Sequence, residues 1–176
     1  MFKRLRLLWK HRWTDPELSL RWVDDAAAER LRVRVQASEA LHTGQVRVCV
    51  ESALPSSYLW RLRPGERVDN AVRARALTWF GRLRVWDTER NNGVLIYLQL
   101  TEHAIEILAD RGLARMVPST FWTDLAERLA QRLRQGHVEQ GLVQAIDEVS
   151  AQLVAHHPRS SVDAIDNELP DAIVRR

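Results

Sequence analysis

The hydrophobic positions of this chain follow two different periods. Apolar residues spaced three or four apart predict amphipathic helices over residues 24–42, 69–83, 118–136 and 138–158. Strict alternation over residues 45–51 predicts a strand with Val46, Val48 and Val50 on one face. A nearly continuous apolar run over residues 94–100 predicts a strand that is buried on both faces, and a short turn leads from it into a third strand over 104–109.

The order of these segments predicts an α/β fold with a mixed sheet. A helix connects the first two strands, so we expect them to be parallel through a right-handed crossover, with the third strand antiparallel to the second. This path brings three segments to one edge of the sheet: residues 42–44, residues 87–92 and Asp110–Arg111. The opposite edge then carries Glu51, Glu102 and His103.

Length and composition place the chain among globular proteins with one main domain. It has 176 residues, of which 45% are hydrophobic and 28% charged. We divide it into a basic, Trp-rich leader over 1–22, an α/β domain over 23–158 and a tail over 159–176 that is mobile or forms a loosely docked short helix. The single cysteine, Cys49, excludes an internal disulfide and a Cys-rich zinc site, and we expect it to be a small buried side chain.

The leader is the most unusual segment in composition. Residues 1–13 contain five Lys or Arg residues and no acid, and Phe2, Leu5, Leu8 or Trp9, and Trp13 share a helix face. This pattern suits an anionic membrane surface. Two alternatives remain open: the apolar side chains pack on the domain while the arginines reach outward, or the tryptophans form a patch that binds a protein partner.

Net charge and targeting signals limit the expected partners and the expected location of the protein. The net charge is only +3, and arginine-rich usage can follow genome composition, so we do not expect a nucleic-acid partner. No apolar run reaches the roughly 20 residues needed to cross a bilayer, and the N-terminal segment has no uninterrupted apolar region of a signal peptide. We therefore expect a cytoplasmic protein, which is peripheral at the inner membrane if the leader binds lipid. The sequence sets no oligomeric state.

The main candidate site is a group of oxygen-bearing side chains at the first edge of the sheet: Asp87, Glu89, Asn91, Asn92 and Asp110. Carboxylate and amide oxygens suit a hard cation, Ca²⁺ or Mg²⁺, and a metal there would hold a phosphoryl oxygen and activate a bound water. The alternative is turn chemistry without metal, in which the asparagines shape the strand entry and the acids cap helices or pair with arginines. No catalytic residue is assigned.

Other candidate side chains have simpler explanations. Thr43 is a hydroxyl ligand or only part of a helix terminator, and His42 is more readily a solvent-facing residue than a catalytic one. Adjacent His156 and His157 diverge by about 100° on a helix, so they do not share one metal. The charged groups of the opposite edge supply an acid–base pair or, more simply, solvated turn charges.

Several stretches match a known family in order along the chain. Residues 87–98 read Asp-Thr-Glu-Arg-Asn-Asn-Gly-Val-Leu-Ile-Tyr-Leu, and residues 104–112 end in Asp-Arg-Gly. Thr43-Gly44 precedes them, and Trp122 and the Gly136–Leu142 segment follow. Together these residues, over about 24–158, resemble the TPM domain family.

The resemblance implies a three-layer α/β/α sandwich with a central mixed sheet. Some members of the family are acid phosphatases, several bind divalent cations near the acidic loop, and others are accessory or assembly factors for membrane complexes. Without a signal peptide or a membrane span, the chain is similar to the compact bacterial branch. We therefore expect an accessory or interaction domain that binds a divalent cation, acts at the cytoplasmic membrane face and has a protein partner, with a metal-assisted acid phosphatase as the alternative.

Overall fold

The computed structural model describes residues 2–160 and 167–176, with side chains from residue 5 onward. Its elements, in chain order, are α1 (Phe2–Arg12), α2 (Leu18–Trp22), α3 (Asp25–Glu39), β1 (Gln45–Glu51), α4 (Ser56–Arg61), α5 (Val68–Arg82), β2 (Gly93–Gln99), β3 (Ala104–Ala109), α6 (Arg111–Ala114), α7 (Ser119–Arg134), α8 (Val138–His156) and β4 (Val174–Arg175). The three predicted strands and four predicted long helices are all present.

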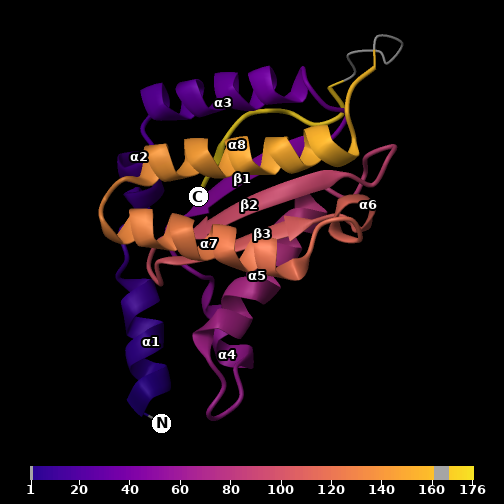
Figure 1. Cartoon of the computed structure of the whole chain (residues 1–176). Helices are drawn as coiled ribbons and strands as arrows, with labels where there is room; N and C mark the ends of the chain where they lie inside the picture. Colours follow the sequence, from indigo (N-terminus) through magenta and orange to yellow (C-terminus); the bar gives the residue numbers. More distant parts are fainter. Residues whose placement is uncertain (1, 161–166) are drawn as a thin grey trace.

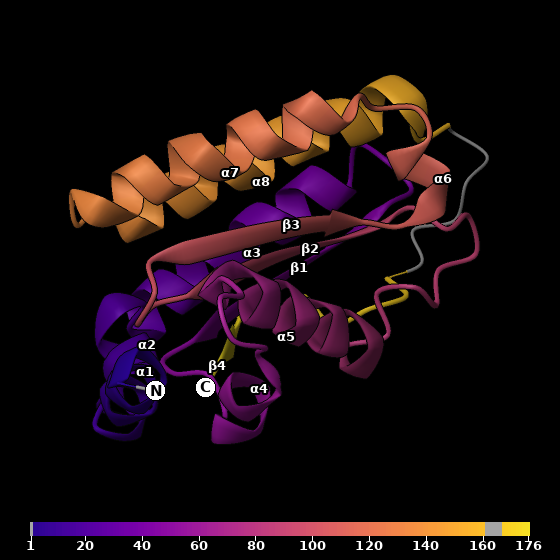
Figure 2. The ribbon, with the colours of Figure 1, turned by 90° about the horizontal axis from the view of Figure 1, so that it is seen from below.

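The strands form one mixed sheet in the order β3-β2-β1-β4. β1 is parallel to β2 and to β4, whereas β2 and β3 form an antiparallel hairpin. Helices α3, α7 and α8 cover one face, and α4 and α5 cover the other (Figures 1 and 2). The predicted three-layer α/β/α sandwich is confirmed.

Two apolar clusters, one on each side of the sheet, explain why all seven residues of β1 are buried. Val46, Val48 and Val50 pack into the cluster beneath α3, α7 and α8, as their alternation predicts. Cys49 lies in the second cluster beneath α5 and is fully buried, also as expected. Alternation identifies the two faces of a strand, but it does not reveal that both are covered.

The tail differs from the expectation of a mobile segment or a short helix. Residues 161–166 of it lie outside the described residues. Val174–Arg175 form β4, which is parallel to β1 and lengthens the sheet by one short strand. The guanidinium of Arg175 donates hydrogen bonds to the Val23 carbonyl and the Asp25 carboxylate, which hold this strand beside the start of α3.

The leader folds onto the domain as two helices, α1 and α2, that flank Pro16. Figure 1 shows α1 at one end of the molecule, beyond the hairpin that joins β2 to β3. Within the part of the chain that the structure describes, no helix combines the length and the apolar character needed to cross a membrane.

Candidate functional site

Three chain segments meet at one edge of the sheet, as the sequence predicts. Gln45 lies opposite Gly93 in the parallel pair, so the residues before β1 and those before β2 are neighbours. The backbone N–H of Asp110, just after β3, donates a hydrogen bond of 2.8 Å to the Gly93 carbonyl. The entries of β1 and β2 and the exit of β3 therefore surround one small region, which we call the strand-entry edge.

The turn before β2 is shaped by backbone contacts. Asn91 has a φ of +51°, a left-handed conformation that asparagine tolerates better than most residues. Its carbonyl accepts a 2.8 Å hydrogen bond from the N–H of Gly112. A Cβ on Gly112 would lie 2.5 Å from the same carbonyl oxygen, so only glycine permits this close approach. Asn91 thus has a clear role in the turn.

Asn92 and Asp110 each place an unsatisfied oxygen at the strand-entry edge. Asn92 is fully buried, and its amide nitrogen donates to the Thr43 hydroxyl at 3.3 Å. One carboxylate oxygen of Asp110 accepts a 2.7 Å bond from the N–H of Arg111 and caps α6. The other oxygen of each side chain, Asn92 Oδ1 and Asp110 Oδ2, is buried and has no hydrogen-bond partner among the described residues. Such oxygens are rare, because burial without a partner costs about 1–3 kcal/mol.

The two other acids of the predicted group lie on the surface of the turn. Asp87 is exposed, and its carboxylate lies 3.9 Å from the guanidinium of Arg84. Glu89 is exposed as well; its backbone N–H donates to the carboxylate of Glu168 at 2.8 Å. Of the five predicted residues, only Asn92 and Asp110 therefore carry buried oxygens without a partner.

The same edge holds two buried imidazole nitrogens. His42 is fully buried, which corrects the expectation of a solvent-facing residue, because the segment after α8 pairs with it: His42 and Pro158 form a β-bridge, and the Thr43 N–H donates to the His157 carbonyl. Its Nδ1 lies 3.1 Å from the Gly44 carbonyl and must carry the proton, which leaves Nε2 as an unpartnered acceptor. Burial lowers the pKa of His42 to about 4. His157 Nε2 is also buried without a partner, and burial lowers the pKa of His157 too.

Thr43 connects the components of this edge. Its hydroxyl accepts hydrogen bonds from the Asn92 amide and, at 3.2 Å, from the Arg90 guanidinium. The described residues contain no group of three or more His, Cys, Asp or Glu side chains arranged to hold a metal. A cation at this edge would therefore depend on amide and carboxylate oxygens together with water, which is a donor set for a hard ion rather than for zinc.

The opposite edge is not a cluster of solvated turn charges. Glu51 is buried and accepts hydrogen bonds from the Arg75 guanidinium, from Trp79 Nε1 at 3.2 Å and from the Tyr97 hydroxyl at 2.6 Å. Its carboxylate is thus fully engaged in a structural ion pair. Glu102 accepts from Lys10 and His11, both at 3.0 Å, and only His103 is exposed.

Sequence reasoning missed a second buried carboxylate, Glu39. Its Oε1 accepts a 2.8 Å bond from the Val46 N–H, and its carboxyl group is hydrogen-bonded to Asp171 from the C-terminal segment. Burial, reinforced by Asp171, raises the pKa of Glu39 to about 8. The available signal was its position four residues after Val35 on the apolar stripe of α3.

Comparisons with known proteins agree with this architecture. The family model of the TPM domain matches residues 22–152, which confirms the resemblance inferred from the motifs. Among solved structures, the fold is similar to the NMR structure of the BA42 protein from the psychrophilic bacterium Bizionia argentinensis, with a TM-score of 0.69 and 24% sequence identity. That likeness covers 88% of this chain and 95% of the other. No curated protein sequence matches.

Proposed function

Because the chain belongs to the TPM domain family, we propose that it is an interaction domain that binds one divalent cation at the strand-entry edge. The observation that supports this proposal is the pair of buried oxygens without partners, Asn92 Oδ1 and Asp110 Oδ2. Asp110 donates its backbone N–H to the carbonyl of Gly93, the residue after Asn92, so both side chains belong to the strand-entry edge.

In this proposal one hard cation takes both oxygens as ligands. Ca²⁺ takes six to eight oxygen ligands, whereas Mg²⁺ keeps several waters and often takes only one or two carboxylates from the protein. Two side-chain oxygens completed by water therefore fit Mg²⁺ better than Ca²⁺. Asp87 and Glu89, exposed on the adjacent turn, add negative charge along the approach without direct ligation.

The groups around this edge support an interaction role. The hydroxyl of Thr43 is engaged by Asn92 and Arg90, and Cys49 is buried within β1 with its pKa raised by burial. Neither group is available as a nucleophile. A bound cation would then fix the geometry of the turn and of α6, and so shape the surface that the edge presents to a partner.

A metal-assisted phosphatase is the second candidate, and His42 is the reason to retain it. Its Nε2 is an unprotonated, unpartnered acceptor at the same edge, which is one requirement of a general base. In this role Asn92 and Asp110 hold the cation, which supplies charge stabilisation to a phosphoryl oxygen, while His42 accepts a proton.

Titration of the full chain with Mg²⁺ and Ca²⁺, observed through backbone amide NMR signals, tests the cation site. We expect saturable shifts confined to residues 87–93 and 110–112. Asp110→Asn keeps an acceptor for the cap of α6 but removes the charge, and should weaken binding by about tenfold or more. Asp87→Asn is the matched control and should bind nearly as well as the wild type.

Three outcomes of these experiments bear on the proposals. Absence of saturable shifts at millimolar metal, or equal affinity in Asp110→Asn, contradicts the cation site. Hydrolysis of a phosphate monoester that requires Mg²⁺ and is lost in His42→Gln, with folding intact, establishes the phosphatase over the interaction domain. Saturable binding without turnover supports the interaction domain.

A further inference from the structure

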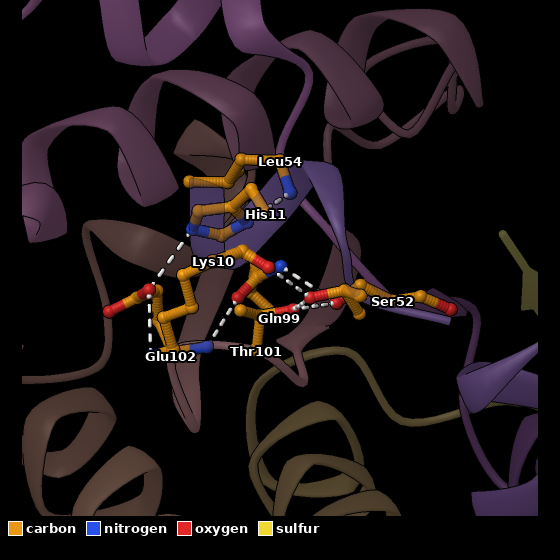
Figure 3. A network of polar contacts seen from close by, with 8 residues as sticks. Lys10, His11, Ser52, Leu54, Gln99, Thr101 and Glu102 are labelled. Atoms are coloured by element: carbon orange, nitrogen blue, oxygen red, sulfur yellow. Dashed lines mark hydrogen bonds and ion pairs between the residues drawn. The ribbon is translucent and has the colours of Figure 1, made fainter. Parts of the chain in front are cut away.

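One face of α1 fastens the helix to the domain. Leu7 and Leu8 pack against the apolar cluster beneath α5. His11 is buried: its Nδ1 accepts a 3.0 Å bond from the Leu54 N–H, so its Nε2 carries the proton and donates to Glu102 at 3.0 Å (Figure 3). At the end of the helix, the hydroxyl of Thr14 lies 3.0 Å from that of Thr101.

The other face of α1 exposes large apolar side chains at helical spacing. Leu5, Trp9 and Trp13 are 45%, 64% and 76% exposed, and we call these three residues the α1 stripe. The rings of Trp9 and Trp13 stack with centroids 6.0 Å apart. The structure thus separates two alternatives left open by the sequence: Leu8 packs on the domain, whereas both tryptophans face outward.

Basic residues border the α1 stripe on both sides. At about 100° per residue, Arg12 falls on one side of the stripe, and Arg6 and Lys10 fall on the other. Lys10 bonds to Glu102, but neither Arg6 nor Arg12 has an ion-pair partner among the described residues. Residues 1–13 contain no acid, so nothing within the helix offsets this charge.

This arrangement decides between a protein and a lipid surface. At a protein interface, an aromatic hot-spot side chain binds in a pocket of the partner, and only a few charged groups of the two proteins need to pair. The α1 stripe instead has cations on both sides, Arg12 on one and Arg6 and Lys10 on the other, and it needs a partner that is apolar below its surface and negative across a broad area. An anionic lipid surface has both properties, and Trp side chains favour its interfacial region.

We propose that the α1 stripe docks the domain onto an anionic membrane surface, with Trp9 and Trp13 inserted at the headgroup level and Arg6 and Arg12 beside lipid phosphates or carboxylates. The contact is peripheral and leaves the buried face of α1 on the domain. It deepens the interaction role proposed above by naming the partner, but it does not use the cation at the strand-entry edge.

Vesicle sedimentation with the full chain tests this docking. One set of vesicles contains phosphatidylcholine alone and the other contains phosphatidylcholine with phosphatidylserine, and EDTA is present so that a bound divalent cation makes no contribution. We expect binding to the anionic vesicles only, falling as salt rises. The double variant Trp9→Ala, Trp13→Ala should have an affinity for the anionic vesicles that is lower by about tenfold or more, because it loses both inserted rings. Arg12→Gln should lower the affinity for the anionic vesicles by about fivefold.

Trp86→Ala is the matched control: Trp86 is 53% exposed and lies in the turn before β2, away from α1. It should bind vesicles as the wild type does, and the thermal midpoint of the double variant should stay close to that of the wild type. The proposal is overturned by absence of vesicle binding at low salt, by equal binding to both kinds of vesicle, or by unchanged binding of the double variant. Because EDTA is present, vesicle binding does not depend on a bound divalent cation. The membrane proposal and the cation-site proposal can therefore be contradicted separately.

Discussion

The buried carboxyl group of Glu39 should make the protein less stable as the pH rises above neutral. The side chain is 7% exposed, and burial raises its pKa to about 8. Its hydrogen bond with Asp171 acts in the same direction, whereas the charge of Arg47 opposes it. In the unfolded chain the pKa of a glutamate is near 4.5. Between these two values the folded protein holds a proton that the unfolded chain has lost.

The sign and size follow from proton linkage. Where the folded state binds the extra proton, the free energy of unfolding falls with rising pH by up to about 1.4 kcal/mol per unit. Between about pH 4 and pH 6.5, His42 makes the free energy of unfolding rise with pH. The pKa of His42 is lowered in the folded state, so in this range the unfolded chain holds the extra proton. His157 has the same sign as His42. The contributions of Glu39 and His42 to the free energy of unfolding therefore largely cancel below pH 6.5. From pH 6.5 to 8 only the contribution of Glu39 remains of the two, and it lowers the free energy of unfolding by about 2 kcal/mol.

Urea unfolding followed by tryptophan fluorescence measures this loss at several pH values. Glu39→Gln mimics the protonated carboxyl group, with an oxygen for the Val46 N–H and an amide donor for Asp171. The variant should lose most of the decline between pH 6.5 and 8 and should show the rise due to His42 at lower pH. Glu29→Gln, on the exposed side of the same helix, is the control. If wild type and Glu39→Gln have the same pH dependence from 6.5 to 8, the assignment is wrong.

Two further changes test the packing around each edge of the sheet. Glu51→Ala leaves the Arg75 guanidinium buried without its carboxylate and should lower the free energy of unfolding by about 3–5 kcal/mol. Removing Asp69, which forms an exposed pair with an arginine, should cost less than about 1 kcal/mol, and similar losses in urea unfolding for both variants would contradict this reasoning. Gly112→Ala places a Cβ against the Asn91 carbonyl and should weaken Mg²⁺ binding at the turn by several-fold, measured by the same NMR titration. Gly81→Ala meets open space in α5 and should leave the affinity unchanged; equal effects of the two substitutions would mean that the turn does not position the site.

Local patterns predicted the strands, their directions and the edge at which three segments meet. Periodicity and segment order are properties of neighbouring residues, so they place Asn92 and Asp110 at the same edge of the sheet. The direction of a turn side chain depends on tertiary contacts, which is why Asp87 and Glu89 seemed equivalent to them. β4 has only two residues and therefore no hydrophobic period, so the sequence does not predict its pairing with β1. Glu51 looked like a solvated charge because its partner Arg75 lies on another element, 24 residues away.

The length of β2 determines how the two ends of the molecule influence each other. Asn92 precedes this seven-residue strand, and Glu102, which holds α1, follows it in the hairpin turn. At about 3.3 Å per residue the two points are roughly 23 Å apart, almost three Debye lengths at physiological ionic strength. Screening by salt therefore leaves little coupling between the exposed charges of α1 and a cation at Asp110. A domain seated on lipid through α1 would carry the strand-entry edge at the other end of β2 from the helix that meets the headgroups.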